Sequence, residues 1–305
     1  FAVAAIVGSL STAGGNWSTL PTPTGWKLGL LAAVWIAGRV LVLTPYGWAA
    51  ALVNAAFPAA AAVALAIPFI ASRNRRNYFF IGLLVLLSLA TLAIHMQQLG
   101  ALDMPPWAGV QLALDIVLFI MAVMGGRVIP MFTNNGVRGA AAMRVTWLER
   151  IALGSLLVLL AADALALAPV VVATCAGVCA VAHFARWWLW QPWVTLRTPL
   201  VWVLHLAYLW IPIHLALRTL ALLGAVTPSV AVHALTVGAM GGLIIGMMTR
   251  TARGHTARPL RADRWDVACY VLVAAAAVVR VGVPLMKPEW LIGSVQLSAN
   301  RTETT

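Results

Sequence analysis

Apolar runs of about twenty residues recur along the whole chain. Each run is long enough to cross the hydrocarbon core of a membrane as a helix. Lipid offers the backbone no hydrogen bonds, which favours helices, and the short alternating strands of a membrane barrel are not apparent. Charged residues make up 9% of the chain, whereas soluble domains carry about 25%. The sequence therefore predicts an all-α, polytopic transmembrane helix bundle.

We expect about nine full spans after a partial first span at residues 1–13. They are predicted near residues 27–44, 48–71, 78–98, 107–126, 147–167, 169–187, 199–222, 229–249 and 266–285. The chain begins with Phe1 inside an apolar run, and its apolar C-terminal stretch is too short to span. We interpret residues 1–305 as a single integral membrane domain truncated at both ends.

Basic residues are concentrated in every second loop, at residues 73–76, 127–150, 186–197 and 250–264. The positive-inside rule places these loops in the cytoplasm. This topology, with contacts to anionic lipid, explains the net charge of +12. The lipid bilayer is thus an expected partner. A basic patch interleaved with aromatic residues is not apparent, so nucleic acid is not predicted as a partner.

Ionisable side chains recur inside the predicted spans. The outer half of the bilayer is expected to hold His95, Asp115, His214 and His233, and the inner half His183 and His205. Such groups are costly in lipid and are usually functional or paired. Imidazole is a common ligand for haem iron, copper and zinc, and helix bundles build such sites from facing helices. We predict metal or haem ligation by His95, His205 and His233. For His183 and His214, interhelical hydrogen bonding is the alternative.

A cysteine and histidine stripe lies on one helix face, at Cys175, Cys179 and His183. Adjacent members could bind Cu(I), which prefers soft ligands. Free cysteine is also common as a small buried apolar residue. All three cysteines of the chain lie in apolar spans, so a disulfide framework is not predicted.

A stripe of small residues follows the last of the apolar-span histidines, at Ala234, Gly238, Gly242 and Gly246. Spacing of four residues places them on one helix face, which favours close approach of another helix. A flat macrocycle lying on the glycine side is the alternative.

The span that ends in GGRVIPMFTNNG turns abruptly polar. Pro130 is predicted to end the helix near Ile129, because proline lacks an N–H and disfavours helix at the preceding residue. Asn134 and Asn135 would then cap the broken end and the start of the next helix. Alternatively, Arg127 and the two asparagines bind an anionic group such as a haem propionate.

Several motifs together resemble those of the NnrS family, bacterial membrane proteins associated with nitric oxide and nitrosative stress. They are TAGGNW, GGRVIPMFTNN, PLVWVLHLAYLWIP, HALTVGAMGG and MTRTARGHTARPL. The resemblance implies haem and copper as cofactors, held by transmembrane histidines. It also implies nitric oxide or a related small molecule as the reaction partner, and the bacterial inner membrane as the location.

The same motifs match individual residues of this chain with residues of the family. His95, His205 and His233 match family histidines, and His255 lies in the GHTARPL motif. Arg127, Asn134 and Asn135 fall in the GGRVIPMFTNN motif. The family carries a histidine-containing segment before the point where this chain begins, so we expect part of a metal site to be missing. TAGGNW replaces the family's TAVPNW, and His214 stands where a small residue is expected.

Two other functions stay open. A transporter without a cofactor would account for the intramembrane Asp115 and for the many Gly and Pro interruptions. A haem–copper oxidase or NO reductase relative would show an adjacent His-His pair, which the sequence lacks. The sequence shows no nucleophile constellation and no phosphate-binding loop, so it does not decide whether the protein is an enzyme. Oligomeric state is equally open.

Overall fold

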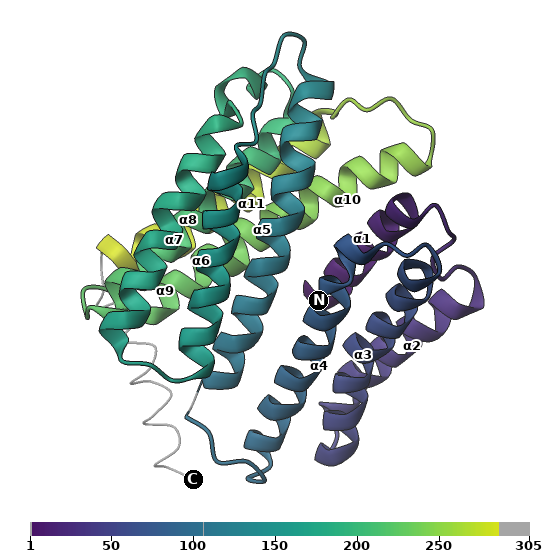
Figure 1. Ribbon diagram of the computed structural model, residues 1–305, viewed down its shortest axis with the longest axis vertical. Helices are drawn as coiled ribbons and strands as arrows, with labels where there is room; N and C mark the ends of the chain where they lie inside the picture. Colours follow the sequence, from purple (N-terminus) through teal and green to yellow (C-terminus); the bar gives the residue numbers. More distant parts are fainter. Residues whose placement is uncertain (1, 106, 287–305) are drawn as a thin grey trace. The chain divides into compact units, whose positions relative to one another are not determined.

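The computed structural model describes residues 2–105 and 107–286, and the described elements are all helices (Figure 1). The all-α prediction is thus confirmed. Phe1 and the C-terminal stretch that was predicted to be too short to span lie outside the described residues. The chain forms two compact units, Phe1–Ile120 and Met121–Thr305, which are described separately below. The expectation of a single membrane domain stays a prediction.

The first unit is organised around α3 (Gly47–Ala71). This helix is apolar on all sides and packs against three others, α1 (Ala2–Ser18), α2 (Trp26–Leu41) and α4 (Phe79–Gln98). A short 3-10 turn, η1 (Arg75–Asn77), precedes α4. The first part of α5 (Ala108–Gly136) completes the unit, with Gly109 lying against Ile94 of α4.

The second unit is organised around α8 (Pro199–Leu222). The other elements are the rest of α5, α6 (Thr146–Ala164), α7 (Pro169–Leu189), η2 (Pro192–Thr195), α9 (Pro228–His233), η3 (Ala234–Gly241), α10 (Gly242–His255) and α11 (Arg264–Met286). Helix α8 packs against α7, α9, η3, α10 and α11, and most of its length is buried. The η3 segment is π-helical and continues α9 into α10. Three helices, α7, α8 and α9, begin with proline, whose fixed φ suits a first helical position.

Seven helices of the described residues are long and apolar enough to cross a membrane. They cover Gly47–Ala71, Arg75–Gln98, Ala108–Gly136, Pro169–Leu189, Pro199–Leu222, Pro228–His255 and Arg264–Met286. Helices α2 and α6, predicted as spans, are not in this set. The chain is therefore a membrane-embedded helical protein with seven candidate spans in its described part.

Helix α5 does not end at Ile129 as predicted. It runs without interruption through Pro130 to Gly136. Proline removes one backbone hydrogen bond, but an apolar surrounding penalises any break that would expose more unpaired backbone groups. The polar residues of the motif thus form the last turn of a continuous helix.

The small-residue stripe packs directly on α8. A β-carbon added at Gly242 would lie 2.7 Å from the Ala207 side chain, and one added at Gly246 would lie 2.8 Å from that of Leu204. Gly238 lies against Trp210 just as closely. The prediction of tight helix packing is confirmed. The alternative of a macrocycle on this side is wrong, because α8 occupies the space.

Candidate functional site

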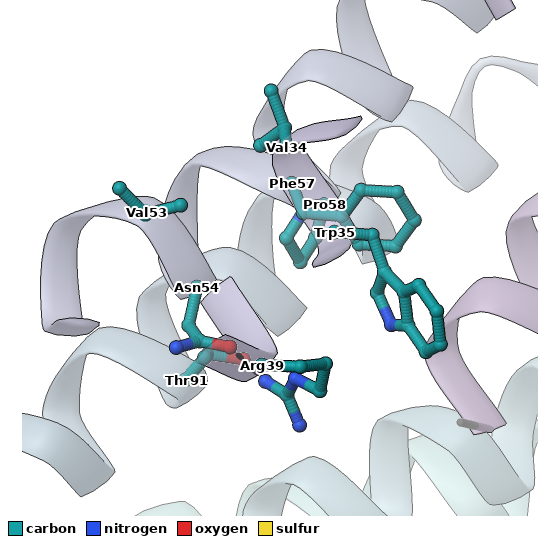
Figure 2. A pocket seen from close by; sticks show the side chains of 8 residues that line it. All are labelled: Val34, Trp35, Arg39, Val53, Asn54, Phe57, Pro58 and Thr91. Atoms are coloured by element: carbon teal, nitrogen blue, oxygen red, sulfur yellow. Dashed lines mark hydrogen bonds between the residues drawn. The ribbon is translucent and has the colours of Figure 1, made fainter. Parts of the chain in front are cut away.

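A pocket of about 190 Å³ lies in the first unit between α2, α3 and α4 (Figure 2). Its walls are largely apolar and include Trp35 of α2 and Phe57 of α3. Three polar side chains line it as well, Arg39, Asn54 and Thr91. Ligand sites are typically apolar cavities with a few convergent polar groups, and this pocket has that composition.

Asn54 holds Arg39 in place. The Nη2 group of Arg39 donates to Oδ1 of Asn54. The Nδ2 group of Asn54 donates in turn to the carbonyls of Gly38, at 3.1 Å, and Ala50, at 2.8 Å. Gly38 permits this approach, because a β-carbon there would lie 2.9 Å from Oδ1 of Asn54. Among the described residues, no carboxylate forms an ion pair with Arg39. A positive charge is therefore held at the pocket without a neutralising partner.

His95 lies one helical turn beyond Thr91, on the same face of α4. Its side chain is half-buried, and the positive charge of Arg39 acts on its imidazole. The ring makes no hydrogen bond to any residue that the structure describes. The first unit thus combines a bare imidazole with a fixed guanidinium. An imidazole can bind a metal, and a guanidinium can pair with a carboxylate.

The second unit repeats part of this arrangement at His233. This residue ends α9, is half-buried, and lies within electrostatic range of Arg280 on α11. The π-helical segment begins at the next residue. π-helical turns inside α-helices are frequent at functional sites. His233 therefore remains a candidate ligand in its own unit.

Helix α8 carries two buried histidines that each keep one ring nitrogen without a partner. The hydroxyl of Thr133 donates to the carbonyl of Ile129, so it accepts from Nε2 of His205, at 2.8 Å. Nδ1 of His214 donates to the carbonyl of Ala231, at 2.7 Å. Nδ1 of His205 and Nε2 of His214 have no hydrogen-bond partner among the described residues. A histidine oriented by a hydrogen bond through one nitrogen, with the other bare, is the usual state of a metal ligand.

His183 shows the opposite state. Its Nδ1 accepts from the Tyr208 hydroxyl, at 2.7 Å, and its Nε2 donates to the carbonyl of Ala152, at 3.0 Å. Both ring nitrogens are therefore used in interhelical hydrogen bonds, which is the alternative that the sequence left open. Cys179 beside it is buried and Cys175 half-buried. In the described part of the chain, no group of three or more His, Cys, Asp or Glu side chains could hold a metal ion.

The sequence missed a buried ion pair between α6 and α7. Arg186, only 1% exposed, donates from Nε to Oε1 of Glu149, at 3.1 Å, and from Nη2 to Oε2, at 2.9 Å. A β-carbon at Gly126 would collide with this guanidinium, and one at Gly125 would lie 2.8 Å from the ring of Tyr208. The Gly-Gly pair of α5 thus makes room for two large polar side chains. The two adjacent glycines were the only sequence signal for this ion pair, since sequence analysis had placed Arg186 in a loop.

The other residues that the sequence predicted as cofactor ligands lie in the second unit, whereas the pocket belongs to the first. The Asn134 side chain accepts from the backbone N–H of Ala142, at 2.8 Å, and donates to its carbonyl, at 3.1 Å. It thereby fixes the connection to α6 and does not cap that helix, whose N-cap is Val145. Asn135 is exposed and Arg127 is half-buried. His255 is exposed at the end of α10.

A family comparison covers nearly the whole chain. The model of the NnrS protein family matches residues 1–300. This range spans both units and includes all six histidines. No curated protein and no solved structure matches the chain.

Proposed function

Because the chain belongs to the NnrS family, we propose that it is a haem-binding membrane protein that acts in the response to nitric oxide and nitrosative stress. The observation that supports haem is the pocket of the first unit. Its guanidinium, Arg39, is oriented by Asn54 and is paired with no carboxylate of the described residues. The bare imidazole of His95, outside the pocket lining and one helical turn beyond Thr91, lies within electrostatic range of this charge. An imidazole can be the axial ligand of haem iron, and a guanidinium can pair with a propionate.

The pocket and the neighbouring His95 fit the parts of a haem. His95 would supply the axial nitrogen, and Arg39 would pair with a propionate. Trp35 and Phe57 offer apolar surface for the edge of the ring. A cavity of about 190 Å³ would receive one edge of the macrocycle. Haem iron would supply the site that binds nitric oxide.

The second unit offers further ligands. His233, half-buried and within electrostatic range of Arg280, is the second candidate haem ligand. His205 and His214 each present one bare, enclosed nitrogen, which suits a single metal ion better than a macrocycle. We include copper in the proposal on the basis of the family, with His205 and His214 each as a separate candidate ligand, because a spacing of nine residues places them on opposite faces of α8.

The proposal also includes a topology. About nine spans cross the bacterial inner membrane, and the basic loops face the cytoplasm. Arg39 and His95 then lie toward the outer face, and Arg144 and Arg150 toward the cytoplasm. Nitric oxide is small and uncharged, and it reaches a site within the bilayer directly from the lipid.

The test is an optical spectrum of the complete purified protein, oxidised and then reduced with dithionite, with and without nitric oxide. We expect a Soret band that shifts on reduction and again on addition of nitric oxide. His95→Ala should remove or shift the band, whereas His255→Ala should leave it unchanged, because His255 is exposed at a helix end. A colourless protein after expression with adequate haem would contradict haem binding and favour a transporter.

A second variant tests the propionate partner. Arg39→Gln removes the charge and keeps a side chain that can bond Asn54. We expect haem to dissociate about tenfold faster, since a hydrogen bond to a charged group contributes about 1.5 kcal/mol. Arg76→Gln, an exposed arginine of the same unit, is the matched control. Equal haem retention in both variants would move the assignment to His233 and Arg280.

A further inference from the structure

Arg250 of α10 carries a positive charge that no carboxylate of the described residues pairs with. Its guanidinium carbon lies 3.6 Å from the ring centre of Phe132 on α5. Both side chains are half-buried. A guanidinium that stacks on a ring uses its face, whereas its N–H groups point outward from its edge. The ring therefore orients a charged group whose donors are directed at something other than a carboxylate of this chain.

Arg250 lies near the end of a candidate span that is longer than a bilayer core. Pro228–His255 has 28 residues, which corresponds to about 42 Å of helix. The hydrocarbon core is about 30 Å thick, so the polar end of this helix, from Thr249 onward, projects into the headgroup layer. The next candidate span begins at Arg264. The turn between the two spans, residues 256–263, therefore lies at a surface of the bilayer.

This turn and its flanks carry more positive charge than their carboxylates neutralise. Arg253 takes both acidic side chains, since its Nη2 donates to Asp263, at 2.7 Å, and its Nε donates to Asp266, at 3.1 Å. The other three arginines are exposed and form no ion pair with a described residue: Arg258, Arg261 and Arg264. A surplus of positive charge at a bilayer surface attracts anionic lipids.

Apolar side chains are exposed among these arginines. Leu260 is 51% exposed and Trp265 is 69% exposed. The guanidinium carbon of Arg264 lies 5.2 Å from the ring centre of Trp265. Tryptophan favours the membrane interface, where its ring meets the acyl boundary and neighbouring arginines reach the phosphates. A nucleic acid would match the charge alone, whereas a phospholipid matches the charge and the exposed apolar surface.

We propose that Arg250, held on the Phe132 ring, binds the phosphate of an anionic phospholipid at the turn between α10 and α11. The phosphate oxygens accept from the N–H groups of Arg250. The exposed arginines of the turn favour an anionic over a zwitterionic headgroup. This inference is independent of the haem proposal, since none of the candidate haem or copper ligands takes part.

The experiment is thermal unfolding of the purified full chain in neutral detergent, with dioleoylphosphatidylglycerol added stepwise. We expect the unfolding midpoint to rise and to saturate. Dioleoylphosphatidylcholine has no net charge and should require a higher concentration, and glycerol 3-phosphate, a headgroup without acyl chains, should have no effect. Arg250→Gln should raise the half-saturating phosphatidylglycerol concentration about tenfold, because a hydrogen bond to a charged group is lost. Arg138→Gln, at an exposed position in the connection between α5 and α6, should leave it unchanged.

Three results would overturn the proposal. In the first, the two lipids saturate at the same concentration, so that the charge of the headgroup has no influence. In the second, glycerol 3-phosphate acts as well as the lipid, so that the ligand is a free phosphate. In the third, Arg250→Gln and Arg138→Gln respond alike, so that the basic loops act together without a local site. If Arg250→Gln does not fold, the double variant Arg258→Gln/Arg261→Gln decides. A weaker preference for phosphatidylglycerol supports the proposal, and an unchanged preference rejects it.

Discussion

His183 and His95 represent two ways in which this protein treats an imidazole inside an apolar helix. His183 is enclosed, and both of its nitrogens are hydrogen-bonded to neighbouring helices. His95 is half-buried, makes no side-chain hydrogen bond to the described residues, and lies within reach of the Arg39 charge. In sequence the two look alike, since each is a lone histidine in a hydrophobic run.

The two histidines differ in how their hydrogen-bonding capacity is used. An apolar surrounding requires buried polar groups to bond to one another, and His183 meets that requirement with protein partners alone. The bonding capacity of His95 is unused, as is that of Arg39 beyond its contact with Asn54. Under the proposed function, the unused capacity of His95 and Arg39 serves the haem, whereas the hydrogen bonds of His183 are structural contacts. Substitutions in the two classes should therefore change different measurable quantities.

The largest expected loss of stability concerns the buried ion pair of Arg186 and Glu149. Glu149→Ala leaves the Arg186 guanidinium buried without its carboxylate. We expect the free energy of unfolding to fall by about 3–5 kcal/mol, measured by denaturant titration of the purified protein. Arg144→Ala is the control, because it removes only the exposed arm of the same network, and it should cost under about 1 kcal/mol. Equal losses in the two variants would mean that burial does not decide the strength of this pair.

A smaller loss is expected for His183→Phe. The substitution keeps the volume approximately but leaves the Tyr208 hydroxyl and the Ala152 carbonyl without their partner, at a cost of about 2 kcal/mol. His95→Phe should cost under about 1 kcal/mol and should change the Soret band, which His183→Phe should leave unchanged. Unfolding and optical spectra of both variants provide the comparison. A spectral change in His183→Phe would break the distinction between used and unused histidines.

The paired asparagines test the same distinction within one motif. Asn134→Ala removes both hydrogen bonds to Ala142 and should lower the free energy of unfolding by about 1 kcal/mol. Limited proteolysis should then cut the connection between α5 and α6 faster. Asn135→Ala, at an exposed position, should change neither quantity. A spectral change in either variant would instead support the propionate-binding role predicted for this motif.

The helical architecture was predictable because composition and run length decide it. Apolar runs of about twenty residues have few alternatives to helices in lipid, and most predicted spans match observed helices within a few residues. The tight packing at Gly238, Gly242 and Gly246 was predictable for a similar reason, since small residues at one helical spacing expose backbone to a neighbour.

The partners of individual polar residues were not predictable. The sequence does not show that Tyr208 bonds His183 or that Thr133 bonds His205, because these contacts join helices far apart in the chain. It also placed the end of α5 at Pro130, whereas an apolar surrounding keeps that helix intact. The bare nitrogens on α8 and the fixed guanidinium of Arg39 became visible only with the packing.

The smallest expected effect belongs to a charge cluster at the start of α11, which is paired and in which Asp263 is exposed. Oδ1 of Asp263 accepts from the backbone N–H groups of Trp265, at 2.9 Å, and Asp266, at 3.0 Å. Oδ2 of Asp266 accepts from the N–H of Asp263, at 3.0 Å, which makes a reciprocal cap. The backbone hydrogen bond from Asp266 is the main cause that holds the pKa of Asp263 below its usual value of 3.8, and Arg253 adds to it.

Because the folded protein lowers this pKa, the contribution of Asp263 is present above pH 3.8 and is lost as the pH falls through the folded value. Hydrogen exchange at the first turn of α11, corrected for the intrinsic pH dependence, should therefore accelerate below pH 3.8. Asp263→Asn keeps the oxygen that caps the helix and removes the titration, so its exchange should be less sensitive to acid. If both proteins lose protection over the same pH range, acid acts on a group other than Asp263. The difference in exposure would then not explain why this cluster contributes less to stability than the enclosed pair of Arg186 and Glu149.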